Sequence, residues 1–107
     1  MRRLDEKVAL VTGGGGLLGA AFARQLAADG AHVLVNDLDS ARAETVVAEI
    51  EGAGGSASAF AGSVDSWEGA GQIVDACLDR YGRIDCLVNA AHTYETGPIA
   101  ELDEASF

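Results

Sequence analysis

A run of four glycines is the strongest chemical signal in this sequence. Residues 12–19 read TGGGGLLG, directly after the apolar residues 8–11 and before the mainly small, apolar residues 20–23. A strand, a glycine turn and the start of a helix let the backbone approach a dinucleotide pyrophosphate. The first N–H groups of a helix have no intrahelical partner and the helix dipole is positive there, so a phosphate would find donors. The run therefore predicts a nucleotide-binding turn.

A carboxylate follows at the spacing that such a turn requires. Asp37 ends the second apolar stretch, 18 residues after Gly19, close to the roughly 20 expected for the acid that binds the adenosine ribose. Its negative charge would repel a 2′-phosphate, which favours NAD over NADP as cofactor. The alternative is that Asp37 only begins a turn, and the nearby Arg42 argues against a strict choice of NAD.

A mononucleotide P-loop is the competing interpretation of the glycines. That motif needs a lysine followed by serine or threonine after its last glycine. Here Ala20 and Ala21 follow Gly19, so ATP or GTP hydrolysis is excluded.

The elements that position these residues alternate along the chain. Apolar runs predict strands at residues 7–12, 32–36, 57–61 and 84–89, and the consecutive apolar residues of the first run indicate a strand covered on both faces. Between them we expect three helices: one ending near Gly30, one capped by Asp39 or Ser40, and one running from a Ser66 cap to Gly82.

Each helix carries an apolar side that should face the sheet. The predicted buried residues are Leu18, Phe22 and Leu26 in the first helix, Ala43, Val46, Val47 and Ile50 in the second, and Ile73, Cys77 and Tyr81 in the third, with Val74 and Leu78 beside them. This alternation predicts an α/β fold, the first half of a Rossmann-type doubly wound parallel sheet with strand order 3-2-1-4. Residues 1–107 would form one NAD(P)-binding half-domain, incomplete at its C-terminus.

Composition excludes several other classes of protein. Seven basic and seventeen acidic residues give a net charge of -10, the wrong sign for holding nucleic acid. No run reaches the roughly 18 apolar residues of a membrane span, and the N-terminus lacks a signal-peptide core, so we expect a cytoplasmic protein. Cys77 and Cys86 have no partners at metal-ligand spacing, which predicts reduced thiols and no metal site.

Several motifs together resemble the short-chain dehydrogenase/reductase family. They are the residues from Thr12 to Gly19, Asp37 after the second strand, the sequence RIDCLVNAA at residues 83–91, and the tail PIAELDEASF at residues 98–107. The resemblance covers the whole chain. It implies an oxidoreductase that transfers hydride between a nicotinamide cofactor and an alcohol or carbonyl compound.

The resemblance also implies which residues contact the cofactor. They are Gly13, Gly15, Gly16, Leu18 and Gly19 in the turn, Asp37 at the ribose, Ser63 and Val64 at the adenine, and Asn89, Ala90 and Ala91 at the adenosine and ribose. Two of these segments depart from the family pattern. Ala90 and His92 stand where the family has NNAG, and Ser63 stands where an aspartate usually reaches the adenine.

The catalytic groups of the family are missing from these 107 residues. Members use a serine and a tyrosine in a Tyr-x-x-x-Lys motif, yet Tyr81 is followed by Asp85, Tyr94 by Pro98, and Lys7 is the only lysine. No catalytic residue is therefore predicted, and the substrate is not encoded here. His92 has no catalytic partner and is expected in a solvated loop, while Asp103 could cap a further helix.

Two questions stay open at this point, the branch of the family and whether the chain is part of a longer enzyme. Leu17 occupies a position where typical-length members have glycine, and Gly13, Gly16 and Gly19 also fit the extended, epimerase-like branch. The chain could be the cofactor-binding half of a longer enzyme, which the unpaired edge of its fourth strand favours. It could instead be a separate dinucleotide-binding or interaction module without catalysis. In a full-length enzyme, a homo-oligomer would be typical of the family.

Overall fold

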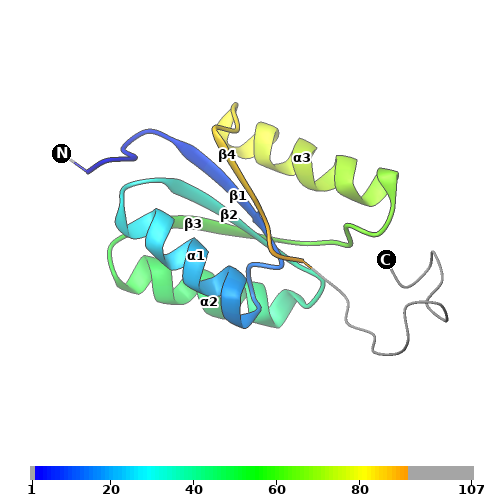
Figure 1. Cartoon of the computed structure of the whole chain (residues 1–107), viewed down its shortest axis with the longest axis horizontal. Helices are drawn as coiled ribbons and strands as arrows, with labels where there is room; N and C mark the ends of the chain where they lie inside the picture. Colours follow the sequence, from blue (N-terminus) through cyan, green and yellow to red (C-terminus); the bar gives the residue numbers. More distant parts are fainter. Residues whose placement is uncertain (1, 92–107) are drawn as a thin grey trace, which may run out of the picture.

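Residues 2–91 form a parallel sheet of four strands (Figure 1). The computed structural model describes residues 2–91. Within them β1 (Val8–Thr12), β2 (His32–Asp37), β3 (Ser56–Ala61) and β4 (Cys86–Asn89) lie in the order β3-β2-β1-β4. The predicted strand order and fold class are confirmed, and the predicted strand ends are correct to within two residues. The two central strands are buried, β1 as predicted, whereas β3 and β4, each with one neighbouring strand, are only partly buried.

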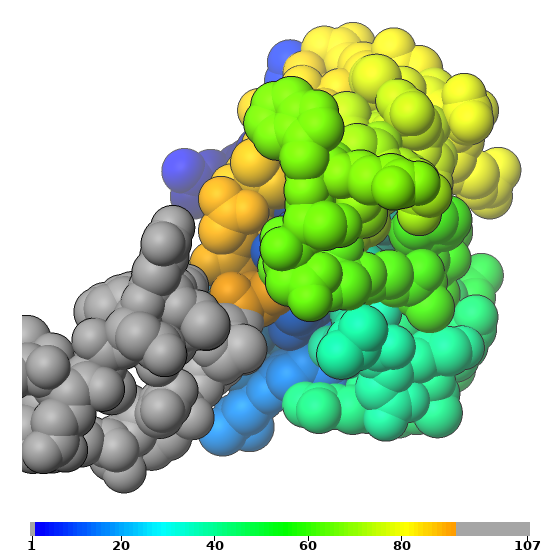
Figure 2. Space-filling view, turned by 90° about the vertical axis from the view of Figure 1, so that its right-hand side faces the viewer, coloured from blue at the N-terminus to red at the C-terminus, as the bar shows by residue number. Residues whose placement is uncertain are grey.

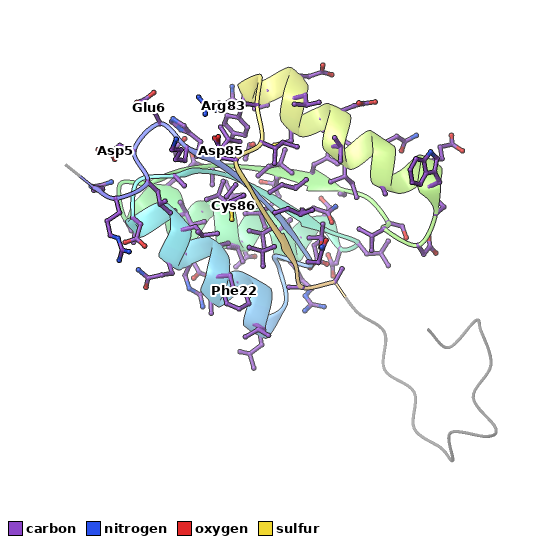
Figure 3. The ribbon with its side chains drawn as sticks, turned by 45° about the horizontal axis from the view of Figure 1, so that its top comes forward. Asp5, Glu6, Phe22, Arg83, Asp85 and Cys86 are labelled. Atoms are coloured by element: carbon purple, nitrogen blue, oxygen red, sulfur yellow. The ribbon has the colours of Figure 1, made fainter. Side chains whose placement is uncertain are left out.

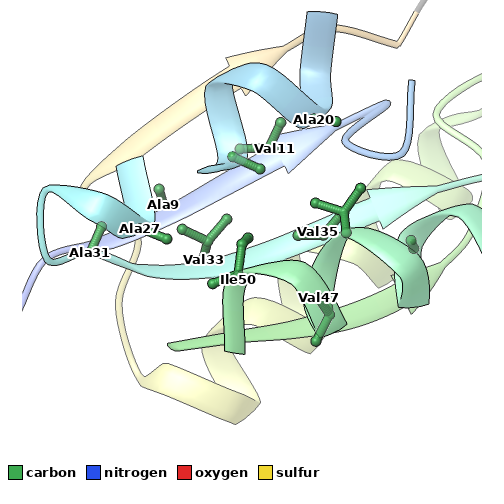
Figure 4. Packing of buried hydrophobic residues seen from close by; sticks show 12 residues of the cluster. Ala9, Val11, Ala20, Ala27, Ala31, Val33, Val35, Val47 and Ile50 are labelled. Atoms are coloured by element: carbon green, nitrogen blue, oxygen red, sulfur yellow. The ribbon is translucent and has the colours of Figure 1, made fainter. Parts of the chain in front are cut away.

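Three helices cover the two faces of the sheet. Helices α1 (Leu17–Ala28) and α2 (Ser40–Gly52) pack on one face, and α3 (Trp67–Tyr81) packs on the other (Figure 1). The larger core cluster joins β1 and β2 to α1 and α2 through alanine, valine and isoleucine side chains, of which Ala9, Val33 and Ile50 are examples (Figure 4). The smaller cluster joins the opposite faces of the same strands to Ile73 and Cys77 of α3.

The predicted buried face of α1 is wrong. Leu18 and Phe22 are 62% and 42% exposed, whereas Ala20, Ala23 and Ala27 are buried against the sheet. Leu26 alone of the predicted stripe packs partly against the core. Alanine is short enough to let a helix axis lie close to the strands, so the inner face of this helix is made of its smallest side chains and not its largest.

The other two helices have the predicted caps. The Asp39 carboxylate accepts the N–H of Ala41 at 2.9 Å at the start of α2, and the Ser66 hydroxyl accepts that of Gly69 at 3.0 Å at the start of α3. Gly82, with φ of 78°, ends α3 in the left-handed conformation that favours glycine.

The inner sides of these two helices follow the predicted stripes. The buried residues of α2 are those predicted, and Ile73 and Cys77 are buried in α3. Val74 and Leu78, predicted beside them, are exposed instead. The buried face of α3 therefore covers a narrower part of the helix surface than its apolar residues do.

Two aromatic residues of α3 have opposite environments. The Tyr81 hydroxyl lies 2.8 Å from that of Ser58 in β3, and its ring stacks on His32 at 5.8 Å between centroids, which joins the end of the helix to the sheet. Trp67, at the other end, is 95% exposed.

No helix within residues 2–91 is long and apolar enough to span a membrane. His92 and the helix predicted after Asp103 lie outside the described residues.

Candidate dinucleotide site

The glycine turn connects β1 to α1 at the carboxyl end of the sheet. Gly13 has φ of 65°, and a Cβ built on it would lie 2.6 Å from Cα of Ala91, so only glycine fits between the turn and the end of β4. A Cβ on Gly19 would overlap the carbonyl oxygen of Gly13. The first turn of α1 is thereby packed directly on the glycine run, which is the general role of the last glycine in such motifs.

The N-terminus of α1 is free to bind an anion. Its cap is Gly16, no side chain caps it, and its first turn contains no acidic residue. Among residues 2–91, no acceptor is recorded for the N–H groups of Leu17, Leu18 and Gly19. Unpaired N–H groups and the positive end of the helix dipole both favour a phosphate at this place.

Asp37 lies beside this turn and is only 7% exposed. Its Oδ2 accepts the N–H of Gly15 at 3.0 Å, and its Oδ1 accepts that of Asp39 at 2.9 Å. The structure therefore brings the predicted ribose acid into contact with the predicted phosphate turn. Each carboxylate oxygen has a second lone pair, so Asp37 can still accept hydrogen bonds from a ligand.

Asn36, which sequence reasoning did not single out, holds the segments around the site together. It is 1% exposed, and its Nδ2 donates to the carbonyls of Phe60 at 2.9 Å and Gly62 at 3.2 Å. Its own carbonyl accepts the N–H of Gly14 at 2.7 Å. A polar residue inside an otherwise apolar strand was the available signal, because a buried amide must find partners.

The end of β4 meets the glycine turn as predicted. Thr12 pairs with Asn89 in the sheet, and the N–H of Ala90 donates to the carbonyl of Thr12 at 3.1 Å. Ala90 and Ala91 lie against Gly13, with Asn89 exposed next to them. From β1 the chain leaves toward one face of the sheet, whereas β4 is entered from the other. This is the switch point where doubly wound sheets bind ligands.

Ser63 and Val64 follow β3 in the chain. Viewed end-on, the segments after β2 (teal) and β3 (green) and the end of β4 (orange) lie on one side of the molecule (Figure 2). Val64 is exposed, and the Ser63 hydroxyl oxygen accepts the N–H of Asp65 at 3.2 Å, which leaves its proton available. Leu38, a residue missed from the sequence, is exposed directly after Asp37. The signal available in the sequence was a leucine directly after the predicted ribose acid.

Two ionisable groups outside this site have shifted pKa values, the thiol of Cys77 and the carboxyl group of Asp85. Within residues 2–91, no group of three or more His, Cys, Asp or Glu side chains could hold a metal ion. Cys77 and Cys86 are free, and burial raises the pKa of the Cys77 thiol. At the opposite end of β4, a hydrogen bond from Arg83 and a second from the Val8 N–H lower the pKa of Asp85 (Figure 3).

Comparison with known proteins decides the family. The sequence model of the short chain dehydrogenases matches residues 7–107. The chain belongs to the short-chain dehydrogenase family. Its sequence is 43% identical over 108 residues to an uncharacterized oxidoreductase of Methylorubrum extorquens, an alignment that covers 100% of this chain and 44% of that protein. It is 39% identical to galactitol 2-dehydrogenase of Agrobacterium fabrum, over 98% of this chain and 40% of that enzyme.

Solved structures of short-chain dehydrogenases have the same fold. The hydroxysteroid dehydrogenase of Escherichia coli superposes with a TM-score of 0.89 at 34% identity, over 96% of this chain and 43% of that one. A metagenomic short-chain oxidoreductase in complex with NADP gives 0.86 at 34% identity, over 95% of this chain and 47% of that one. The chain thus spans less than half the length of these relatives.

Proposed function

We propose that this chain is the dinucleotide-binding half of an NAD(P)-dependent oxidoreductase. The observation that carries the proposal is the contact of Asp37 Oδ2 with the Gly15 N–H, because it joins a ribose acceptor to an uncapped helix N-terminus. Family membership supports hydride transfer between the nicotinamide and an alcohol or carbonyl compound. Several relatives are named as dehydrogenases of sugar alcohols, which supports the same reaction class.

The residues around the turn fit the parts of a dinucleotide. We assign the pyrophosphate to the N–H groups at the start of α1, with Gly13, Gly15, Gly16, Leu18 and Gly19 lining it. The ribose hydroxyls would donate to Asp37. The exposed apolar side chains of Leu38 and Val64 are suited to the faces of an adenine, and the Ser63 hydroxyl to its edge. Asn89, Ala90 and Ala91 would lie along the ribose at the switch point.

The proposal includes a preference for NAD over NADP. The carboxylate of Asp37 accepts hydrogen bonds from an unphosphorylated ribose and repels a phosphate on its 2′-oxygen. A reducing compartment, the cytoplasm, suits the two free thiols. Proton transfer to the substrate would fall to the serine, tyrosine and lysine of the family pattern, which this sequence does not contain.

Thermal unfolding with each nucleotide tests the proposal. A ligand that binds only the folded state stabilises it by RT ln(1 + [L]/Kd), about 2.7 kcal/mol at a ligand concentration of about 100 Kd. At equal concentrations, we expect NADH to raise the melting temperature (Tm) of the chain more than NADPH does. Equal shifts would contradict the NAD preference, and no shift with either nucleotide would contradict the proposed function.

Replacing the ribose acid gives the sharper form of the test. Asp37→Ala should remove the difference between the NADH and NADPH shifts, because the discriminating charge is gone. It should also lower the Tm of the unliganded protein, since Asp37 holds two backbone N–H groups. Each shift is therefore measured against the same variant without ligand. Asp79→Ala, which removes an exposed carboxylate from α3, is the matched control and should keep the wild-type difference.

A further inference from the structure

A serine and a histidine lie side by side where β2 and β3 begin. His32 and Ser56 are the first residues of these strands and pair with each other in the sheet. The Oγ of Ser56 lies 2.8 Å from Nδ1 of His32, which is the distance expected between a nucleophile and its general base. Ser56 is exposed and His32 half-buried, so a reagent can reach the hydroxyl group.

A third residue holds the imidazole in place. The ring of Tyr81, the last residue of α3, stacks on that of His32 with 5.8 Å between the centroids and 21° between the ring planes. The Tyr81 hydroxyl is held in turn by that of Ser58, 2.8 Å away. A nucleophile bonded to a base that a third group orients is the arrangement of activated nucleophiles in enzymes.

A backbone donor follows the serine directly in the chain. Successive N–H groups of a strand point to opposite sides, and the Gly62 N–H donates to the carbonyl of Asp37 in β2 at 3.1 Å. The N–H of Ala57, five residues earlier, therefore points away from β2, to the side on which β3 has no neighbouring strand among residues 2–91. In α/β-hydrolases, the N–H of the residue after the nucleophile stabilises the oxyanion. Ala57 has this position relative to Ser56.

We propose that Ser56 is an acylation site, activated by His32, that reacts with activated carboxylic esters. Ser56 Oγ forms a bond to the ester carbonyl carbon while its proton passes to Nδ1 of the neutral imidazole. The bond from that carbon to the leaving oxygen then breaks, and the imidazolium returns its proton to the leaving group or to water. The pair lies at the start of its strands, whereas the glycine turn follows the end of β1, so the inference is independent of the proposed dinucleotide site.

Mass spectrometry of peptides after exposure to 4-nitrophenyl acetate tests the proposal. Ser58 is the control within the wild-type chain, because it lies on the same face of β3 but its hydroxyl is bonded to Tyr81. Lys7, the only lysine, is exposed and reports how fast the reagent acetylates an ordinary nucleophile. We expect Ser56 to be acetylated at least about 100-fold faster than Ser58, the lower end of what a general base contributes.

Substitutions of the neighbours separate the base from the residue that positions it. His32→Gln keeps a polar side chain beside Ser56 but removes the base, so it should slow acetylation of Ser56 by about 100-fold and leave that of Lys7 unchanged. Tyr81 is a positioning residue. Tyr81→Phe keeps the stacked ring and should retain the reactivity of Ser56, whereas Tyr81→Leu should reduce it.

Equal acetylation of Ser56 and Ser58 in the wild type would overturn the proposal, and so would an unchanged rate at Ser56 in His32→Gln. Circular dichroism shows whether His32→Gln folds; if it does not, the comparison of the two serines in the wild type decides alone. Binding of NADH is measured separately by the Tm shift. Either this proposal or the proposed function can therefore fail without the other.

Discussion

At the scale of single residues, the glycines of the turn are not equivalent. Gly13 is required by its backbone conformation and by the contact with Ala91, whereas Gly19 is required by space alone. Gly71 of α3 is a third case, because a Cβ built on it meets nothing within 4 Å. Two helical glycines of this chain therefore predict opposite responses to the same substitution.

Gly19→Ala should destabilise the protein by about 1–3 kcal/mol, since the new methyl group would meet the backbone of Gly13 and Gly14. Gly71→Ala should stabilise it by about 0.5–1 kcal/mol, because alanine is the better helix former. Urea unfolding followed by circular dichroism measures both changes. Gly19→Ala should also weaken NADH binding, whereas Gly71→Ala should not. A neutral Gly19→Ala would show that α1 can shift without cost.

The sequence predicted that the glycine turn and Asp37 lie together, but it did not predict the other contacts around them. The glycine turn and Asp37 have a recognisable spacing, so their proximity could be expected from the order of strands and helices alone. The contacts of Asn36 with Phe60 and of Arg42 with Gly15 join residues 24 and 27 positions apart, and no local pattern encodes them. The sequence places Leu38 directly after the ribose acid, but only the fold shows that its side chain is exposed there.

At the scale of elements, the inner face of α1 shows where a periodic pattern misleads. Leu18, Phe22 and Leu26 recur every four residues, as a buried stripe would, yet the alanines between them face the sheet. A prediction from hydrophobic periodicity is dominated by the large apolar side chains, whereas a helix that packs close to a sheet buries its small ones. The central strands could be predicted because a parallel strand covered on both faces is a continuous apolar run. Such a run is recognised without knowing which of its side chains point to which face.

Strand β4 depends on Asp85 at its start. The Asp85 carboxylate accepts the N–H of Val8 at 2.9 Å, its own N–H donates to the Val8 carbonyl at 2.8 Å, and Arg83 lies 2.7 Å from the other carboxylate oxygen (Figure 3). These contacts fix the register of β4 against β1. They also keep the folded-state pKa of Asp85 below its usual value, chiefly through Arg83.

Asp85→Asn should therefore lower the free energy of unfolding in a pH-dependent way. A depressed carboxylate pKa contributes stability that is fully present above the unfolded pKa of about 3.9 and is lost as pH falls through the folded pKa. The variant should be less stable than the wild type at neutral pH, and the two should converge at low pH. Urea unfolding at several pH values measures this difference. Asp79→Asn, at an exposed position of α3, should show no such convergence; a constant Asp85→Asn effect at all pH values would contradict the assignment.

At the scale of the whole molecule, charge dominates the surface. A net charge of -10 on 107 residues makes the folded chain repel itself, and compactness increases that repulsion. The same field disfavours the approach of an anionic dinucleotide, and the uncapped N-terminus of α1 counteracts it locally. Raising the ionic strength is therefore expected to stabilise the folded chain, because it screens this self-repulsion.

The Tm of the unliganded protein should rise by a few degrees between about 0.01 M and 0.1 M sodium chloride, as the Debye length falls from about 30 Å to about 10 Å. Differential scanning calorimetry measures the change. Potassium chloride should have the same effect, because screening depends on ionic strength and not on the cation. A fall in Tm with salt would mean that favourable ion pairs outweigh the self-repulsion of the acidic surface.

The exposure of Trp67 has a consequence for spectroscopy. It is the only tryptophan of the chain, and at 95% exposure its indole is in water in the folded protein as it would be in the unfolded one. Its emission should already lie at long wavelength before denaturant is added, so fluorescence would report little of the unfolding transition. The same exposure makes it a sensitive target for added quenchers. A loss of quenching when a nucleotide binds would place that nucleotide over the start of α3.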